Sequence, residues 1–295
     1  MDRRRLQASL DRVIEAIGSP GAADLADSTY SENGQRLPIG EGLWATANEI
    51  GPYRHAFLDE EAGQAACFVT LTEGAARSIM ALRVKAPGGK VAEIEALVAR
   101  PPLFGGASAF GDGPAALDAS GGPDPAWFED IAPAERMTRA ELERVAGMYF
   151  AGLERNDGRG DYPFADGCIR IENGFRTTGV PPAPTAGKTP YQEAFRALSA
   201  KQQFQTGYFR FVDRIRERRF PVIDPAHGVV FTFAFFDHSG TVRDYELADG
   251  TPIRSAVERP FSWMIAEAFR IERGLITRIE ALMTECPYGM RSGWA

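Results

Sequence analysis

A lone carboxylate inside an apolar strand is the clearest candidate for chemistry in this chain. Residues 263–271 read Trp-Met-Ile-Ala-Glu-Ala-Phe-Arg-Ile, and a strand period of two places Glu267 on one face with Trp263. Burial among apolar side chains would raise the pKa of this carboxyl toward the range of a general acid or base. The alternative is a Glu267 that pairs with a strand-edge arginine such as Arg170 or Arg243.

The three histidines give weaker signals. His238 follows the apolar strand 231–236, and an unperturbed imidazole titrates near neutrality, so it could both accept and donate a proton. An exposed turn histidine is the plain alternative. His227, in the turn Pro-Ala-His-Gly, is the second candidate among the histidines for this role. His55, next to Tyr53, could reach across a domain interface, although a surface role is the simpler expectation.

Several aromatic residues could surround these groups. Tyr149 and Tyr208 could direct hydroxyl groups into a cavity, although core packing accounts for most such aromatics. We expect an aromatic lining formed by Phe164, Phe231, Phe233, Phe235 and Trp263.

Motifs for cofactors and metals are missing from the sequence. It has no Gly-x-Gly-x-x-Gly after a strand, Walker loop, Gly-x-Ser-x-Gly elbow or His-Glu-x-x-His. Three cysteines at unrelated spacings suit neither a disulfide framework nor a zinc knuckle, which predicts a reducing, cytoplasmic setting. We therefore expect chemistry without cofactor or metal.

Charge and hydropathy narrow the class of partner. A net charge of −7 and a pI near 5.2 leave no basic footprint for nucleic acid. No signal peptide and no apolar run of membrane-spanning length is apparent. The expected partner is a small molecule.

An internal repeat organises the chain. Glu-Asn-Gly turns at 32–34 and 172–174, and Ile-Glu-Ala-Leu at 94–97 and 279–282, recur in the same order. We predict an N-terminal half at 1–100, a Pro/Gly-rich linker at 101–137 and a C-terminal half at 138–295. Met80 matches Glu267 in this alignment, which places the chemistry in the second half, with the first half as a structural partner that walls one side of the pocket. Residues 178–189 are a candidate lid.

The order of elements resembles the NTF2-like (SnoaL-like, ketosteroid-isomerase-like) superfamily. Each half reads as helix, short hairpin, further helix and long antiparallel strands, and residues 267–279 are similar to the last two strands of that superfamily. The resemblance implies an α+β fold of two tandem cone-shaped barrels, in which helices pack on a curved antiparallel sheet around an apolar cavity. It also implies that His238 and Glu267 form an acid–base pair, and that Asp166 and Arg170 contact the substrate.

With its two Glu-Asn-Gly turns and residues 285–294, the chain further resembles a two-domain branch of the superfamily, one member of which releases formaldehyde from lignin-derived diarylpropane diols. This resemblance implies a cofactor-independent carbon–carbon lyase for a hydroxylated aromatic compound, with Tyr208 or Arg170 assisting. Alternatives are a dehydratase, isomerase or polyketide-type cyclase at the same site, or a non-catalytic binding module. A homo-oligomer is expected because sheet faces in the superfamily often pair. The predicted substrate contacts are Tyr149, Phe164, Asp166, His227, Phe231, Phe235 and Trp263.

Overall fold

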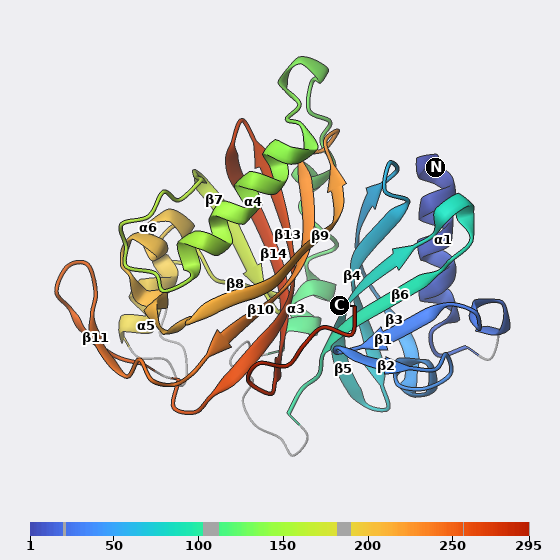
Figure 1. Cartoon of the computed structure of the whole chain (residues 1–295), viewed down its shortest axis with the longest axis horizontal. Coiled ribbons are helices and arrows are strands. Elements are labelled where there is room, and N and C mark those ends of the chain that lie inside the picture. Colours follow the sequence, from blue (N-terminus) through green and yellow to red (C-terminus); the bar gives the residue numbers. More distant parts are fainter. Residues whose placement is uncertain (20–21, 103–111, 182–189, 256, 295) are drawn as a thin grey trace.

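A computed structural model describes residues 1–19, 22–102, 112–181, 190–255 and 257–294 (Figure 1). The first half begins with helix α1 (Arg3–Ala16) and contains the short helices η1 (Ala22–Leu25), α2 (Leu43–Thr46) and η2 (Pro87–Gly89). Its sheet consists of β1 (Thr29–Glu32), β2 (Gln35–Leu37), β3 (Ala47–Asp59), β4 (Gln64–Glu73), β5 (Ala76–Lys85) and β6 (Glu93–Ala99).

The second half repeats this plan with additional elements. Its helices are α4 (Arg139–Leu153), α5 (Pro190–Ala197), α6 (Ala200–Gln205) and η5 (Tyr208–Phe211). Its main sheet consists of β7 (Phe164–Glu172), β8 (Phe175–Arg176), β9 (Arg214–Asp224), β10 (Val229–His238), β13 (Phe261–Glu272) and β14 (Leu275–Cys286). A separate small ribbon pairs β11 (Asp244–Glu246) with β12 (Pro252–Arg254).

The two main sheets have the same strand order. It is β2-β1-β6-β5-β4-β3 in the first half and β8-β7-β14-β13-β10-β9 in the second. One pair in each sheet is parallel, β1 with β6 and β7 with β14, and the other pairs are antiparallel. This order confirms the predicted α+β fold built from two tandem units. The domain boundaries at 100 and 138 stay predictions.

The repeated Glu-Asn-Gly turns have the same conformation and the same contacts. Asn33 and Asn173 have φ values of 45° and 46°, and the glycines after them 80° and 84°, which is the left-handed pair that a two-residue hairpin turn requires. Each Asn side chain also bonds both backbone polar groups of one residue on the neighbouring strand, Val98 or Met283. The turn therefore fixes the edge of each sheet as well as the hairpin.

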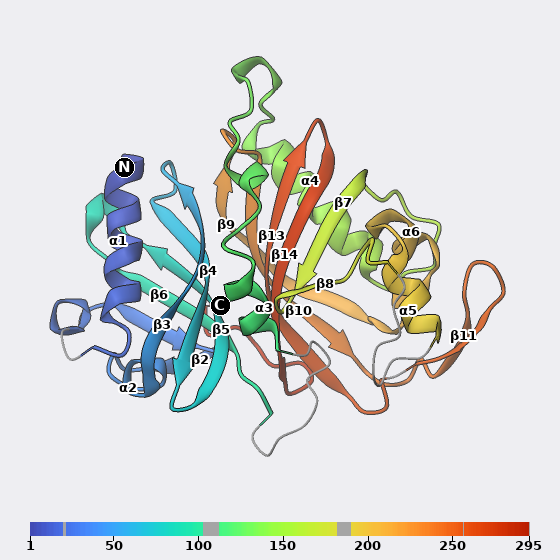
Figure 2. The ribbon, with the colours of Figure 1, turned by 180° about the vertical axis from the view of Figure 1, so that it is seen from behind.

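The two sheets pack back to back through the faces that point away from α1 and α4 (Figures 1 and 2). One hydrophobic cluster joins both halves, and within it the ring centroid of Phe231 lies 5.7 Å from that of Phe57 and 5.5 Å from that of Phe68. Because helices cover the outer faces, the central strands are buried on both sides, and every residue of β10 is buried. The layers are thus helix, sheet, sheet, helix.

Two carboxylates from the repeated Ile-Glu-Ala-Leu motif cross this junction in equivalent ways. Glu95 receives hydrogen bonds from Arg219 of the second half at 2.5 and 3.0 Å. Glu280 reaches into the first half, where Nδ1 of His55 lies 2.6 Å and the Tyr53 hydroxyl 2.9 Å from its oxygens. Since β3 also contacts β9 and β6 contacts β14, the halves meet as an internal pseudo-dimer. His55 is fully buried here, which corrects the expected surface role.

Residues 112–138, which lead from the first sheet to the second along the chain, run along the junction of the two sheets (Figure 2). It contains α3 (Gly113–Ala119), η3 (Pro125–Phe128) and η4 (Pro133–Glu135). Trp127 is buried against His55, with the ring centroids 4.8 Å apart, whereas Phe128 is 51% exposed. After it, Thr138 is the N-cap of α4 and forms a capping box with Glu141.

Because both halves share this hydrophobic cluster, a destabilising substitution in one half should also destabilise the other. Phe68→Ala removes a first-half side chain that contacts Phe231 of the second half, and the expected cost is about 3–5 kcal/mol of unfolding free energy. Hydrogen exchange followed by mass spectrometry should then show faster exchange in β13 and β14 as well as in β4. Acceleration confined to the first half would contradict a common core.

Candidate functional site

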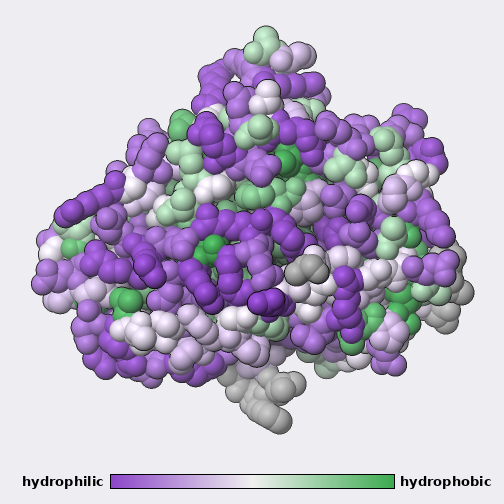
Figure 3. All heavy atoms as spheres, in the orientation of Figure 1, coloured by the Kyte–Doolittle hydropathy of each residue, from purple (hydrophilic) through white to green (hydrophobic). Residues whose placement is uncertain are grey.

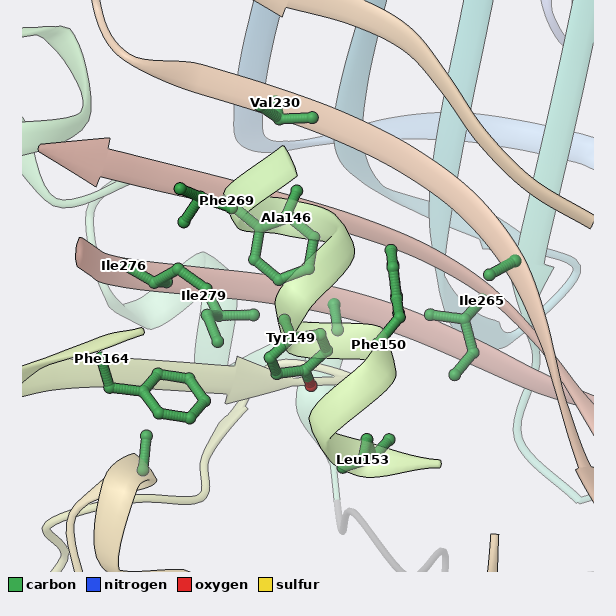
Figure 4. Close-up of a cluster of buried hydrophobic side chains, with 14 of the residues drawn as sticks. Ala146, Tyr149, Phe150, Leu153, Phe164, Val230, Ile265, Phe269, Ile276 and Ile279 are labelled. Atoms are coloured by element: carbon green, nitrogen blue, oxygen red, sulfur yellow. The ribbon is translucent and has the colours of Figure 1, made fainter. Parts of the chain in front are cut away.

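Glu267 lies on the face of the second sheet that α4 covers. The neighbours expected on this face, Ile265, Phe269 and Ile271, are in the same core cluster, and Trp263 packs against it. Figure 4 shows Tyr149 and Phe150 of α4 placed over Ile265, Phe269 and Ile279. The strand alternation therefore predicted the face correctly. The first half packs on the opposite face, so it does not wall this site as expected; it supports the sheet from behind.

Three polar side chains surround the Glu267 carboxyl. Tyr149, from α4, and Arg170 and Glu172, from β7, are close enough to influence the pKa of this carboxyl. The register places them together, because Glu267 pairs with Ala281 and Ala281 pairs with Glu172 in one row across β13, β14 and β7. The site is thus built by one helix and three adjacent strands.

Burial dominates the electrostatics of Glu267. Its carboxyl is fully buried, which raises the pKa to about 8; the nearby Tyr149 hydroxyl lowers the pKa, Glu172 raises it and Arg170 lowers it. Within the described part of the chain, Oε2 of Glu267 has no hydrogen-bond partner. The expected alternative, an ion pair with Arg170 or Arg243, is not formed. A carboxyl with this pKa holds its proton at neutral pH.

Arg170 is held by neighbours other than Glu267. Its guanidinium donates to Oε1 of Gln203 at 2.5 Å and to the Thr177 hydroxyl at 3.2 Å, and lies 3.5 Å from a Glu172 oxygen. Sequence reasoning missed Glu172 and Gln203 as site residues. Glu172 could have been found, because it follows Arg170 by two residues on the same strand and so shares its face. Gln203 had no comparable signal.

The structure does not bring His238 and Glu267 together. On β10, His238 pairs with Phe261 while Thr232 pairs with Glu267, six positions apart, which is about 20 Å of strand. The His238 ring stacks on Phe261, with centroids 4.5 Å apart, and its burial lowers the pKa to about 4. At neutral pH it is an uncharged ring in an aromatic stack, so the expected pair cannot exchange a proton directly.

The remaining aromatic candidates divide between two places. Phe164 belongs to the Glu267 face, with its ring centroid 6.0 Å from that of Tyr149. Tyr208, on η5, is in a separate aromatic group with Phe195, at 4.4 Å, and Phe211, at 5.5 Å. Tyr208 is therefore beside the site rather than in it.

Four predicted substrate contacts are misplaced. Phe231 and Phe235 point toward the first half, because β10 is buried on both faces and alternate residues face opposite ways. Asp166 is exposed, since β7 bulges between Phe164 and Ile169 and carries it out of the sheet. His227 is in the β9–β10 turn, where Nδ1 lies 2.8 Å from Asp224.

The alignment with the first half also shifts by two residues. Glu267 pairs with Ala281, and the residue that pairs with the equivalent Ala96 is Leu82, whereas Met80 pairs with Val98. The turn between β5 and β6 is longer than that between β13 and β14, which displaces a simple alignment. Leu82 and Met80 are both buried in the apolar core of the first half. The carboxylate therefore has no counterpart at either position.

Glu267 itself is buried, with 1% of its surface exposed. Surface hollows of about 570, 560 and 500 Å³ lie elsewhere on the described residues, and Glu267 lines none of them. The face in Figure 3 is mainly hydrophilic, with smaller hydrophobic areas near its centre. Of the predicted lid, residues 182–189 lie outside the described residues.

Within the described ranges, no helix has both the length and the apolar character needed to cross a membrane. The same ranges contain no group of three or more His, Cys, Asp or Glu side chains arranged to hold a metal ion.

Comparisons with known proteins give a family but no activity. Residues 135–283 match the model of a domain of unknown function (DUF8021). No curated protein sequence matches the chain.

Solved structures match about half of the chain. A de novo designed protein with a curved β-sheet is 13% identical, with a TM-score of 0.28 over 50% of this chain and 88% of that one. AclR, a candidate hydroxylase from Streptomyces galilaeus, is 11% identical, with a TM-score of 0.27 over 50% of this chain and 91% of that one. A candidate SnoaL-like polyketide cyclase from Jannaschia sp. CCS1 is 14% identical, with a TM-score of 0.23 over 52% of this chain and 90% of that one. These scores are low, so the fold assignment rests on the strand order.

The raised pKa of Glu267 predicts how stability depends on pH. Because its folded-state pKa of about 8 exceeds the ordinary 4.5, only the folded chain keeps this proton between those values. Relative to Glu267→Gln, the wild-type free energy of unfolding should fall by about 1.4 kcal/mol per pH unit as pH rises through this window. Urea unfolding from pH 5 to 8 measures it, with the exposed Glu285→Gln as control. Parallel curves for wild type and Glu267→Gln would contradict the assignment.

Proposed function

This chain belongs to the DUF8021 family, whose function is unknown, and we propose that its C-terminal half is a cofactor-independent acid–base enzyme for a small hydroxylated aromatic molecule. The observation that carries the proposal is the fully buried Glu267 carboxyl, whose Oε2 has no partner within the described residues and whose pKa is raised to about 8. Such a group can give a proton to a leaving oxygen at neutral pH.

The reaction we propose is a fragmentation that releases formaldehyde. Glu267 protonates a benzylic hydroxyl, which leaves as water. Glu172, whose side chain is 20% exposed, accepts the proton of the neighbouring primary alcohol, whose carbon departs as formaldehyde. The electron pair of the broken carbon–carbon bond becomes the double bond of a stilbene, so atoms and charge balance. Two carboxyls in different surroundings suit these opposite roles.

The aromatic surroundings support this class of substrate. Phe164 and Phe269 pack against Tyr149 on the α4-facing side, and rings there can pack against the rings of a substrate. Arg170 would stabilise negative charge that develops on a phenolic oxygen. The resemblance to a formaldehyde-releasing branch supports the specific reaction, and the geometry supports its acid–base step.

One observation favours an isomerase, dehydratase or cyclase as a second candidate. Tyr149 and protonated Glu267 are adjacent, and two neutral donors side by side can hold an enolate oxygen. A salt bridge of Glu267 at the surface would favour a binding module without catalysis. Glu267 is instead buried and forms no salt bridge with Arg170.

A direct assay tests the proposed reaction. Purified protein incubated with a diarylpropane diol, without added cofactor or metal, should yield formaldehyde and the absorbance of a stilbene. Glu267→Gln cannot donate the proton and should lose about 100-fold or more of the rate while staying folded. Glu285→Gln, on the exposed part of β14, should behave as wild type.

Two results would overturn the proposal in different ways. If neither this diol nor related β-hydroxy aromatics give product, the lyase assignment fails. If product forms but Glu267→Gln turns over at a near-normal rate, Glu267 is not the acid.

A further inference from the structure

Gln203 is the fully buried centre of a small hydrogen-bond network. It lies on α6, whose first turn is fixed by a capping box between Ser199 and Gln202. Its Nε2 donates to the carbonyl oxygens of Thr177 at 2.7 Å and Phe195 at 2.9 Å. With both amide protons committed to carbonyls, Oε1 has to face the third partner, Arg170, at 2.5 Å. The orientation of the amide is therefore set by its surroundings.

Arg170 is a buried cation beside a buried carboxyl, yet the two do not form an ion pair. Arginine and carboxylate at close range ordinarily form two parallel hydrogen bonds. Here the guanidinium instead bonds Gln203 and Thr177 and lies 3.5 Å from Glu172, while Oε2 of Glu267 has no partner in the described part of the chain. Something has to hold the cation in this arrangement.

We propose that Gln203 is a positioning residue that holds the Arg170 guanidinium away from Glu267, so that the Glu267 carboxyl is left without a cationic partner. Its neutral amide oxygen accepts one Arg170 donor in a fixed direction, and the two carbonyl bonds keep that oxygen in place. The use of the Glu267 proton rests on the proposed function, but the effect on Glu267 itself does not.

Among the groups that face Glu267, Arg170 is the one whose position decides whether Glu267 is charged. Tyr149 comes from α4, and Arg170 and Glu172 come from β7; Cys168, also on β7, acts on Arg170. Glu172 disfavours a charge on Glu267, whereas Arg170 favours it. A direct ion pair with arginine lowers a carboxyl pKa by about 1–3 units. Movement of Arg170 toward Glu267 would therefore ionise Glu267 near neutral pH.

Titration of Glu267 in Gln203 variants tests this without a substrate. Carboxyl-carbon NMR of glutamate-labelled protein reports each pKa, and the signal missing in Glu267→Gln identifies Glu267. Gln203→Met removes the acceptor at similar volume, so the pKa of Glu267 should fall by about one unit or more. Gln203→Glu gives up the two bonds to carbonyl oxygens but sets a negative charge beside the Arg170 guanidinium, which should hold Arg170 there, so the pKa of Glu267 should stay at or above the wild-type value.

The controls separate this role from folding and from the reaction. Gln205→Met, an exposed change on the same helix, should leave the titration unchanged. An unaltered Glu267 pKa in folded Gln203→Met would overturn the proposal, and so would a fall in Gln203→Glu, which decides the question if the Met variant does not fold. A wild-type protein that titrates as described but forms no formaldehyde would reject the lyase and leave the role of Gln203 standing.

Discussion

Burial of one carboxyl without a counter-charge is the constraint on which the rest of the second half depends. A charged Glu267 could not be accommodated among Ile265, Phe269 and Tyr149 without a partner, so it holds its proton. The nearest cation, Arg170, has to be kept in other contacts, which is where Gln203 and Thr177 enter. The strands on which these groups lie have to be held from behind, which the first half does.

The tandem repeat explains why the two halves have different tasks. Both use the same turn and the same Ile-Glu-Ala-Leu strand, and in both the glutamate of that strand points into the junction. The halves differ on the helix-covered faces of their sheets. Leu82 of the first half stands at the strand position that is equivalent to Glu267 in the second half. The first half thus supports the second sheet from behind, and the polar groups of the proposed site come from the second half.

Sequence patterns predicted some features well, for physical reasons that particular residues show. The Asn-Gly turns require positive φ, so their conformation could be predicted, and the alternation around Glu267 identified its face. Phe231 and Phe235 were misplaced because a strand buried on both faces has no polar side to orient the pattern. Around His55 the alternation is clear, with Arg54 exposed between buried Tyr53 and His55, but the sequence left open what this buried face packs against.

Other site features depend on contacts between distant segments. Gln203 is 33 residues from Arg170, and no local spacing relates them. His238 was expected near Glu267, but strand register decided otherwise. Asp166 left the sheet through a bulge that has no clear sequence signature.

Infrared difference spectroscopy between wild type and Glu267→Gln tests the central claim most directly. A protonated carboxyl has a C=O stretch distinct from the bands of a carboxylate, and the variant removes it. We predict that the wild-type band is present at pH 7 and disappears as pH rises through about 8. A carboxylate signal for Glu267 already at pH 6 would show that the buried group is charged, and the account of the site would be wrong.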